Sequence, residues 1–131
     1  MKIFLSHSSR EAWIAGQIRK EIEEIGGEVW LDDVDIETGD EAEAEMREGL
    51  DNCSELLVLL SPFSVDRPYV WMEIGVAWSQ RKRVVGVLNN LTRTELLARD
   101  GMPAFLKGIR LRELNDLDGY LEELKRRIER G

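Results

Sequence analysis

Cysteine and histidine are almost missing from this chain of 131 residues. The single cysteine, Cys53, has no second cysteine with which to form an internal disulfide, and the single histidine is His7. One thiol and one imidazole make a poor metal-ligand set, so we expect a site without metal. Because Cys53 adjoins an apolar stretch, we interpret it as a small buried residue rather than a nucleophile.

Long apolar runs are lacking too. No run approaches the roughly 18 residues of a membrane span, and "MKIFLSHSSRE" turns polar too early for a signal peptide. Basic residues are the minority, 18 against 26 acids, and the net charge of −8 disfavours nucleic acid as the main partner. We therefore expect a cytoplasmic protein that binds neither membrane nor nucleic acid. The length fits one domain over residues 1–131.

Two periodicities alternate along the chain. Apolar runs typical of strands occupy 2–6, 28–31, 55–61, 83–88 and 109–111. Helical spacing occupies 10–25, 41–53, 66–78 and 116–129, with a short helix and a loop at 92–108. In the first helix the spaced apolar residues are Trp13, Ile14, Ile18, Ile22 and Ile25. This alternation predicts an α/β protein, a flavodoxin-like three-layer sandwich whose five-stranded parallel sheet has the order 2-1-3-4-5 with helices on both faces.

Three polar segments follow the first three predicted strands. They are "SHSS", "DDVDIETGD" and "SPFSVDRP". In open parallel sheets, ligands bind beyond the carboxyl ends of the strands at the switch point of the strand order. The convergence of these segments predicts a site at that edge. Two interpretations of Ser8 and Ser9 stay open, because a serine there suits either a helix N-cap or a bound phosphate.

Common nucleotide and hydrolase motifs are absent. The sequence contains neither GxGxxG nor GxxxxGK[ST], and it has no GxSxG elbow. A phosphoacceptor receiver domain shares the predicted fold, but it needs an acidic pair at the first strand and an aspartate after the third. Here those strands end in Ser6 and in "LLSP". The placement of the acids therefore excludes a receiver.

Glu73 is the one acid inside a helix that is otherwise apolar and aromatic, "DRPYVWMEIGVAW". Helical spacing aligns it with Tyr69, four residues earlier. One interpretation is an ordinary solvent-facing acid. The other is a functional carboxylate, because the helix begins at the predicted site and places Glu73 within about 10 Å of it. A carboxylate in such a cleft has the chemistry to stabilise a developing positive charge.

The order of these motifs resembles a TIR (Toll/interleukin receptor) domain of the bacterial type. "IFLSHSS" resembles the first family box. "GGEVWLDDVDIETGDEAEAEMREGLDNCSELLVLLSPFSVDRPYVWMEI" resembles the second box, its loop, and the strand and helix that follow. The resemblance covers residues 2 to about 90; the segment 91–131 fits only in helix content and has no Phe-Trp pair for the third box.

The resemblance implies an NAD+ glycohydrolase that cuts the nicotinamide–ribose bond, in bacterial immunity or signalling, with a linear or cyclised ADP-ribose as product. Glu73 falls on the catalytic glutamate of the family, and Tyr69 stands where members often have Trp. Ser6, His7 and Ser8 would line the ribose-phosphate side, and Trp30, Asp35 and the loop 32–39 would cover the nucleotide. NAD+ would be the substrate, with no other cofactor.

The resemblance also implies partners and alternatives. Self-association through loop 32–39 would complete the site, and a partner protein or small molecule would supply the activating signal. The alternative from a different class is a non-enzymatic TIR–TIR interaction module. A third candidate is a nucleoside deoxyribosyltransferase-like enzyme, which also sets a glutamate against a ribosyl cation on a related fold.

Overall fold

The computed structural model describes residues 1–31, 46–99 and 109–131. Five parallel strands form one sheet in the order β2-β1-β3-β4-β5. The strands are β1 (Lys2–Ser6), β2 (Glu28–Leu31), β3 (Glu55–Leu60), β4 (Arg83–Leu88) and β5 (Arg110–Glu113). The predicted strand order is confirmed, and it sets the switch point between the carboxyl ends of β1 and β3.

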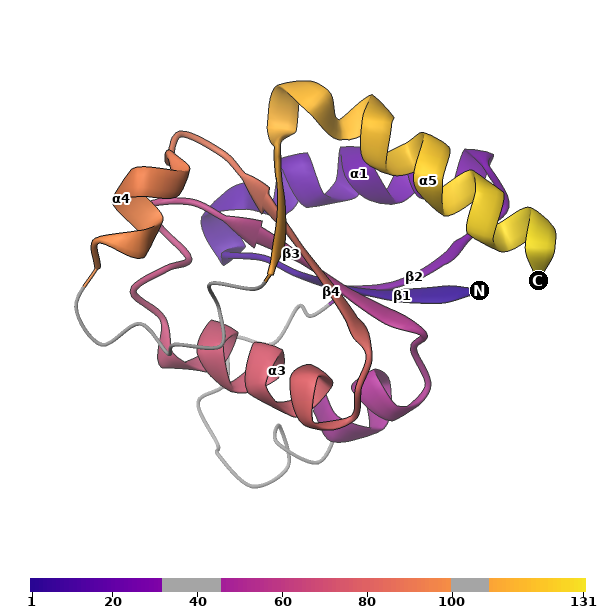
Figure 1. Cartoon of the computed structure of the whole chain (residues 1–131), viewed down its shortest axis with the longest axis horizontal. Helices are drawn as coiled ribbons and strands as arrows, with labels where there is room; N and C mark the ends of the chain where they lie inside the picture. The colour runs from indigo at the N-terminus through magenta and orange to yellow at the C-terminus, as the bar shows by residue number, and fades with distance from the viewer. Residues whose placement is uncertain (32–45, 100–108) are drawn as a thin grey trace.

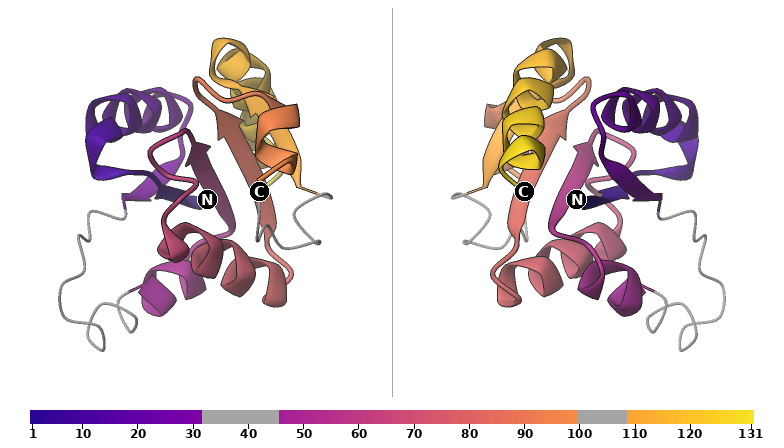
Figure 2. Two further views of the ribbon diagram at one scale, coloured as in Figure 1. Left: turned by 90° about the vertical axis from the view of Figure 1, so that its left-hand side faces the viewer. Right: turned by 90° about the vertical axis from the view of Figure 1, so that its right-hand side faces the viewer.

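Helices cover both faces of this sheet (Figure 1). They are α1 (Ala12–Glu24), α3 (Pro68–Ser79), α4 (Arg93–Leu97) and α5 (Leu117–Arg130), with helical residues 46–51 and the short 3-10 turns η1 (Ser9–Glu11) and η3 (Leu114–Asp116). Figure 2 shows α1 and α5 on one side of the sheet, and α3 with the helical residues 46–51 on the other. The predicted flavodoxin-like sandwich is therefore confirmed.

Strand alternation divides the core into two clusters, one on each face of the sheet. Ile3 and Leu5 of β1 pack with α1 and α5, and Phe4 packs with α3 and the helical residues 46–51. The central strand β3 is buried along its whole length, as expected for a parallel strand covered on both faces. Among the described residues, no helix has the length and apolar character that crossing a membrane requires.

The first helix departs from its predicted apolar face at one residue. Ala15, Ile18 and Ile22 are buried against the sheet, but the side chain of Trp13 is 76% exposed. Trp13 lies about 200° around the helix from Ala15, so it cannot share the buried face. The prediction that groups Trp13 with the apolar face of this helix is wrong, because its angle around the helix axis turns it toward solvent.

Candidate functional site

Ser6 ends β1 at the carboxyl edge of the sheet. Its register partner is Val58 of β3, and both side chains point to the face that α3 covers, since Val58 and Phe4 belong to the cluster packed against α3. Ser6 is only 1% exposed, and within the described part of the chain its Oγ atom has no hydrogen-bond partner. A buried hydroxyl of this kind is expected to find a partner, so its setting suits a bound polar group.

His7 and Ser8 lie on the connection that leaves β1. His7 Nδ1 donates to the Ser8 carbonyl oxygen at 2.9 Å. The Ser8 hydroxyl accepts from the Arg10 amide at 3.2 Å and caps the turn η1. The N-cap interpretation of Ser8 is therefore confirmed, and a contact of either residue with a ligand stays a prediction.

Glu73 lies in the middle of α3, a helix that begins with Pro68 in the first turn after the extended residue Arg67. The buried residues of α3 are Val70, Glu73, Ile74 and Ala77. Glu73 is 1% exposed, so its interpretation as an ordinary solvent-facing acid is wrong. A carboxylate is rarely buried without a structural or chemical reason, because burial removes it from water.

Tyr69 stands one turn before Glu73 and packs against the same hydrophobic cluster as Phe4 and Val58. The Tyr69 hydroxyl and the Oε2 atom of Glu73 are shielded from solvent, as is the Oγ atom of Ser6. Three of the predicted site residues thus lie on the same side of the sheet: Tyr69 and Glu73 on α3, and Ser6 at the end of β1. This arrangement combines a buried acid, an aromatic ring and a hydroxyl.

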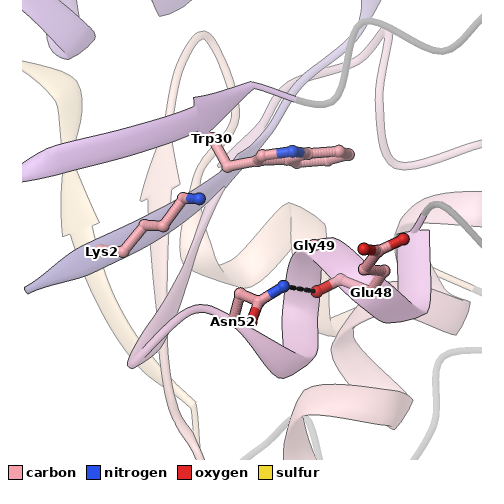
Figure 3. Close-up of a pocket in the computed structure, with 5 residues that line it drawn as sticks. All are labelled: Lys2, Trp30, Glu48, Gly49 and Asn52. Atoms are coloured by element: carbon pink, nitrogen blue, oxygen red, sulfur yellow. Dashed lines mark hydrogen bonds between the residues drawn. The ribbon is translucent and has the colours of Figure 1, made fainter.

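Trp30 belongs to the same side of the sheet, lies on the edge strand β2 and is partly buried. Its ring stacks on Phe4 with centroids 4.6 Å apart and an interplanar angle of 27°. The backbone of Gly49 lies so close that a Cβ atom there would be 3.0 Å from the indole. Trp30 also lines a hollow of about 360 Å³, with Lys2, Glu48, Gly49 and Asn52 (Figure 3). Lys2, the first residue of β1, lines this hollow and Ser6 does not. A nucleotide contact of Trp30 stays a prediction.

Asp35 and the loop 32–39 lie outside the described residues. Among the residues that are described, no group of three or more histidine, cysteine, aspartate or glutamate side chains could hold a metal ion.

A second buried acid at the carboxyl edge was missed by the sequence reasoning. Glu11 of η1 is 4% exposed, and its Oε1 atom accepts from the Ser61 hydroxyl. Its Oε2 atom accepts from Asn89 Nδ2 at 2.9 Å. Ser61 and Asn89 directly follow β3 and β4, and polar residues in those positions were the one signal available in the sequence.

Comparisons with known proteins agree with this geometry. A model of the TIR domain family matches residues 3–125. A comparison with curated proteins finds no match. Solved structures of low sequence identity share the fold, among them the following three. The TIR domain of the Toll-related receptor TRR-2 from Hydra magnipapillata aligns at TM-score 0.69 and 14% identity, over 97% of both chains. The CMP N-glycosidase BcmB from Clostridium botulinum aligns at TM-score 0.63 and 18% identity, over 95% of this chain and 98% of its own. A 2-desoxiribosyltransferase from Leishmania mexicana aligns at TM-score 0.61 and 14% identity, over 92% of this chain and 97% of its own.

Proposed function

The chain belongs to the TIR domain family, which its match over residues 3–125 shows, and on that premise we propose that it cleaves NAD+ between nicotinamide and ribose. The observation that carries the proposal is the burial of Glu73, a carboxylate 1% exposed in the middle of α3. Two proteins that share the fold are named an N-glycosidase and a 2-desoxiribosyltransferase, names that denote reactions at the bond between a base and its sugar. Their fold is compatible with the proposed chemistry.

The proposed reaction breaks the bond between the nicotinamide nitrogen and C1′ of the ribose. The electron pair of that bond leaves with the ring nitrogen, which loses its positive charge. Positive charge then develops on C1′ and the ribose ring oxygen, and the Glu73 carboxylate stabilises it. Water adds to C1′ and releases a proton to give ADP-ribose; capture by a nucleophile of the ADP-ribose itself gives a cyclic product. NAD+ is the substrate, and no catalytic cofactor takes part.

The other predicted residues would bind the rest of the substrate. Ser6 offers a buried hydroxyl on the same sheet face as Glu73, and Tyr69 offers a ring one turn away. His7 and Ser8 would face the ribose and phosphates from the connection after β1. Trp30, Asp35 and the loop 32–39 would cover the nucleotide.

We place this activity in the cytoplasm, in a bacterial immune or signalling response, under the control of assembly. TIR domains commonly self-associate. A contact through loop 32–39 of a second copy would complete the site, so a partner protein or a small molecule that gathers copies would switch the enzyme on. Activity is then expected to rise more steeply than in proportion to protein concentration.

The test is nicotinamide release from NAD+ by the concentrated protein, measured by liquid chromatography. Glu73→Gln removes the charge and keeps the shape, and we expect its rate to fall by about 100-fold or more. Glu122→Gln is the matched control, because Glu122 is an exposed acid on α5. Equal rates for the wild type and Glu73→Gln, with the fold intact by circular dichroism, would remove Glu73 from the mechanism.

A non-enzymatic interaction module is the second candidate, favoured by the exposure of Trp13. Its indole is 76% exposed on α1, the highest value among the large apolar side chains of the described residues. An exposed indole of this kind suits a protein contact. Self-association measured by light scattering that survives Glu73→Ala, together with no turnover of NAD+, would favour this candidate.

A deoxyribosyltransferase-like reaction is the third candidate, favoured by the fold shared with the Leishmania enzyme. It uses the same buried acid but a different substrate. Incubation with deoxynucleosides and a free acceptor base, beside NAD+, separates the two reactions, because only the transferase exchanges the base.

A further inference from the structure

Glu11 lies where three connections of the sheet meet. It belongs to η1 after β1, and it accepts hydrogen bonds from Ser61 after β3 and from Asn89 after β4. The sequence separations are 50 and 78 residues. Within the described part of the chain, Glu11 forms no salt bridge, so both of its carboxylate oxygens are held by neutral donors.

The hydrogen bonds continue from Ser61 toward α3. Ser61 Oγ accepts from the amides of Phe63 at 3.1 Å and Ser64 at 3.3 Å. Ser64 Oγ accepts from the Ser61 amide at 2.9 Å and donates to the Leu59 carbonyl oxygen at 2.8 Å. These bonds fix the connection 61–67, which leads directly into Pro68 and α3. Glu11 therefore acts on the start of the helix that carries Glu73.

The chemistry of the two donors selects a carboxylate at this position. The Ser61 hydroxyl and the Asn89 amide both donate, so the group between them must offer two acceptors. A glutamine would offer one acceptor and one donor, so the Asn89 amide would have to turn over and present its oxygen to stay paired. Burying a carboxylate among neutral groups costs free energy. At this position the carboxylate also links the connections that follow β1, β3 and β4.

We infer that Glu11 is a positioning residue of the site, which fixes the connection 61–67 and thereby the place of Glu73. This inference rests on the proposed function for its catalytic consequence but not for its structural one. Catalytic geometry is sensitive to small shifts, because a misplacement of about 1 Å costs about 100-fold in rate. Glu11 acts through Ser61 and α3 and does not touch the substrate.

The experiment first removes the acceptors at position 11 and then exchanges donor and acceptor across the bond to Asn89. Glu11→Leu removes both acceptors and so breaks the bonds to Ser61 and Asn89 together. The double variant Glu11→Gln/Asn89→Asp restores a matched pair, because the carboxylate introduced at position 89 accepts from the amide introduced at position 11, and the carbonyl oxygen of that amide still accepts from Ser61. Asn89→Asp alone sets two carboxylates against each other and is the mismatched control.

Two readouts are taken, amide hydrogen exchange of peptides over residues 61–72 and the steady-state kinetics of NAD+ cleavage. In Glu11→Leu we expect exchange to accelerate about tenfold or more, as the loss of a buried hydrogen bond implies. We expect kcat to fall with little change in KM, since Glu11 does not bind the substrate. The double variant should recover both, and Asn89→Asp alone should lose both. Ser61→Ala removes the donor of the bond to Glu11 and also the acceptor of the Phe63 and Ser64 amides, so it should accelerate exchange at least as much and serves if Glu11→Leu fails to fold.

Unchanged exchange over 61–72 in Glu11→Leu would overturn the inference. So would accelerated exchange with wild-type kcat, because Glu11 would then support the fold without positioning the site. A wild-type protein that does not cleave NAD+ would contradict the proposed function, and the exchange pattern with its rescue by the double variant would still decide whether Glu11 holds α3.

Discussion

Replacing Arg127 with alanine should destabilise the protein more than the same replacement of an exposed charged residue. Glu55 is the first residue of β3, at the amino edge of the sheet, and it is 2% exposed. Arg127 of α5 donates from Nε to Glu55 Oε1 at 3.2 Å and from Nη2 to both carboxylate oxygens at 3.1 Å. The Tyr120 hydroxyl donates to Oε2 at 3.2 Å. The variant Arg127→Ala leaves the Glu55 carboxylate buried, with Tyr120 as its remaining side-chain partner in the described part of the chain.

The magnitude follows from the burial of the pair. Removing one partner of a buried ion pair costs about 3–5 kcal/mol. The Arg127 side chain is 18% exposed, so water can reach the space that it leaves. We therefore expect a loss of stability at the lower end of this range, about 3 kcal/mol. With an unfolding entropy of about 2.1 cal/mol/K per residue, that corresponds to a fall in Tm of roughly 10 °C.

Chemical denaturation and thermal melting of Arg127→Ala, Glu55→Gln and the double variant measure the effect. Glu55→Gln removes the charge that Arg127 compensates, so the double variant should lose less stability than the sum of the two single variants. Arg126→Ala, at an exposed neighbour on α5, should stay within about 0.5 kcal/mol of the wild type. A loss of less than about 0.5 kcal/mol in Arg127→Ala would refute the reasoning, because the pair would then behave as an exposed one.

Three further predictions concern packing and titration. Gly49→Ala should destabilise the protein by about 1–3 kcal/mol, because its Cβ atom would be 3.0 Å from Trp30. Gly16→Ala in α1 meets nothing within 4 Å and should stabilise the protein by about 0.5–1 kcal/mol. Equal changes of Tm in the two variants would contradict this. Burial raises the pKa of the Cys53 thiol, so a thiol reagent at pH 8 should label it only as the protein opens, and native labelling as fast as in denaturant would be the contrary result. Burial, and then Glu55, raise the pKa of Tyr120 above its ordinary value, so stability is complete below the unfolded pKa of about 10 and falls as pH rises above it. Tyr120→Phe should make that alkaline loss shallower, and an identical slope would count against it.

The layers of the fold could be predicted because the sequence encodes them locally. The run "ELLVLL" in β3 is apolar after its first residue, as a strand covered on both faces requires, and segments of helical spacing separate the strands. The strand order followed from general rules for parallel sheets and not from any single residue. The same local pattern placed Glu73 inside an apolar helix, which is why its burial could be suspected.

Features that depend on distant partners could not be predicted. In the sequence Glu11 is one more acid of a charged helix, and only the fold brings it to residues 50 and 78 positions away. The stacking of Trp30 on Phe4 is likewise a contact between two strands that apolar patterning alone does not specify. The exposure of Trp13 is the opposite case, since apolar character alone predicts burial and its angle around the helix excludes it from the buried face.

The most direct test of the account is the rate of nicotinamide release from NAD+ by the protein clustered on a surface, compared with Glu73→Gln clustered at the same density. Clustering supplies the assembly that the proposed mechanism requires. The account predicts turnover by the wild type that falls by about 100-fold or more in Glu73→Gln, while Glu122→Gln keeps the wild-type rate. Clustered wild-type protein that releases no nicotinamide, or a Glu73→Gln variant that releases it at the wild-type rate, would contradict the central claim.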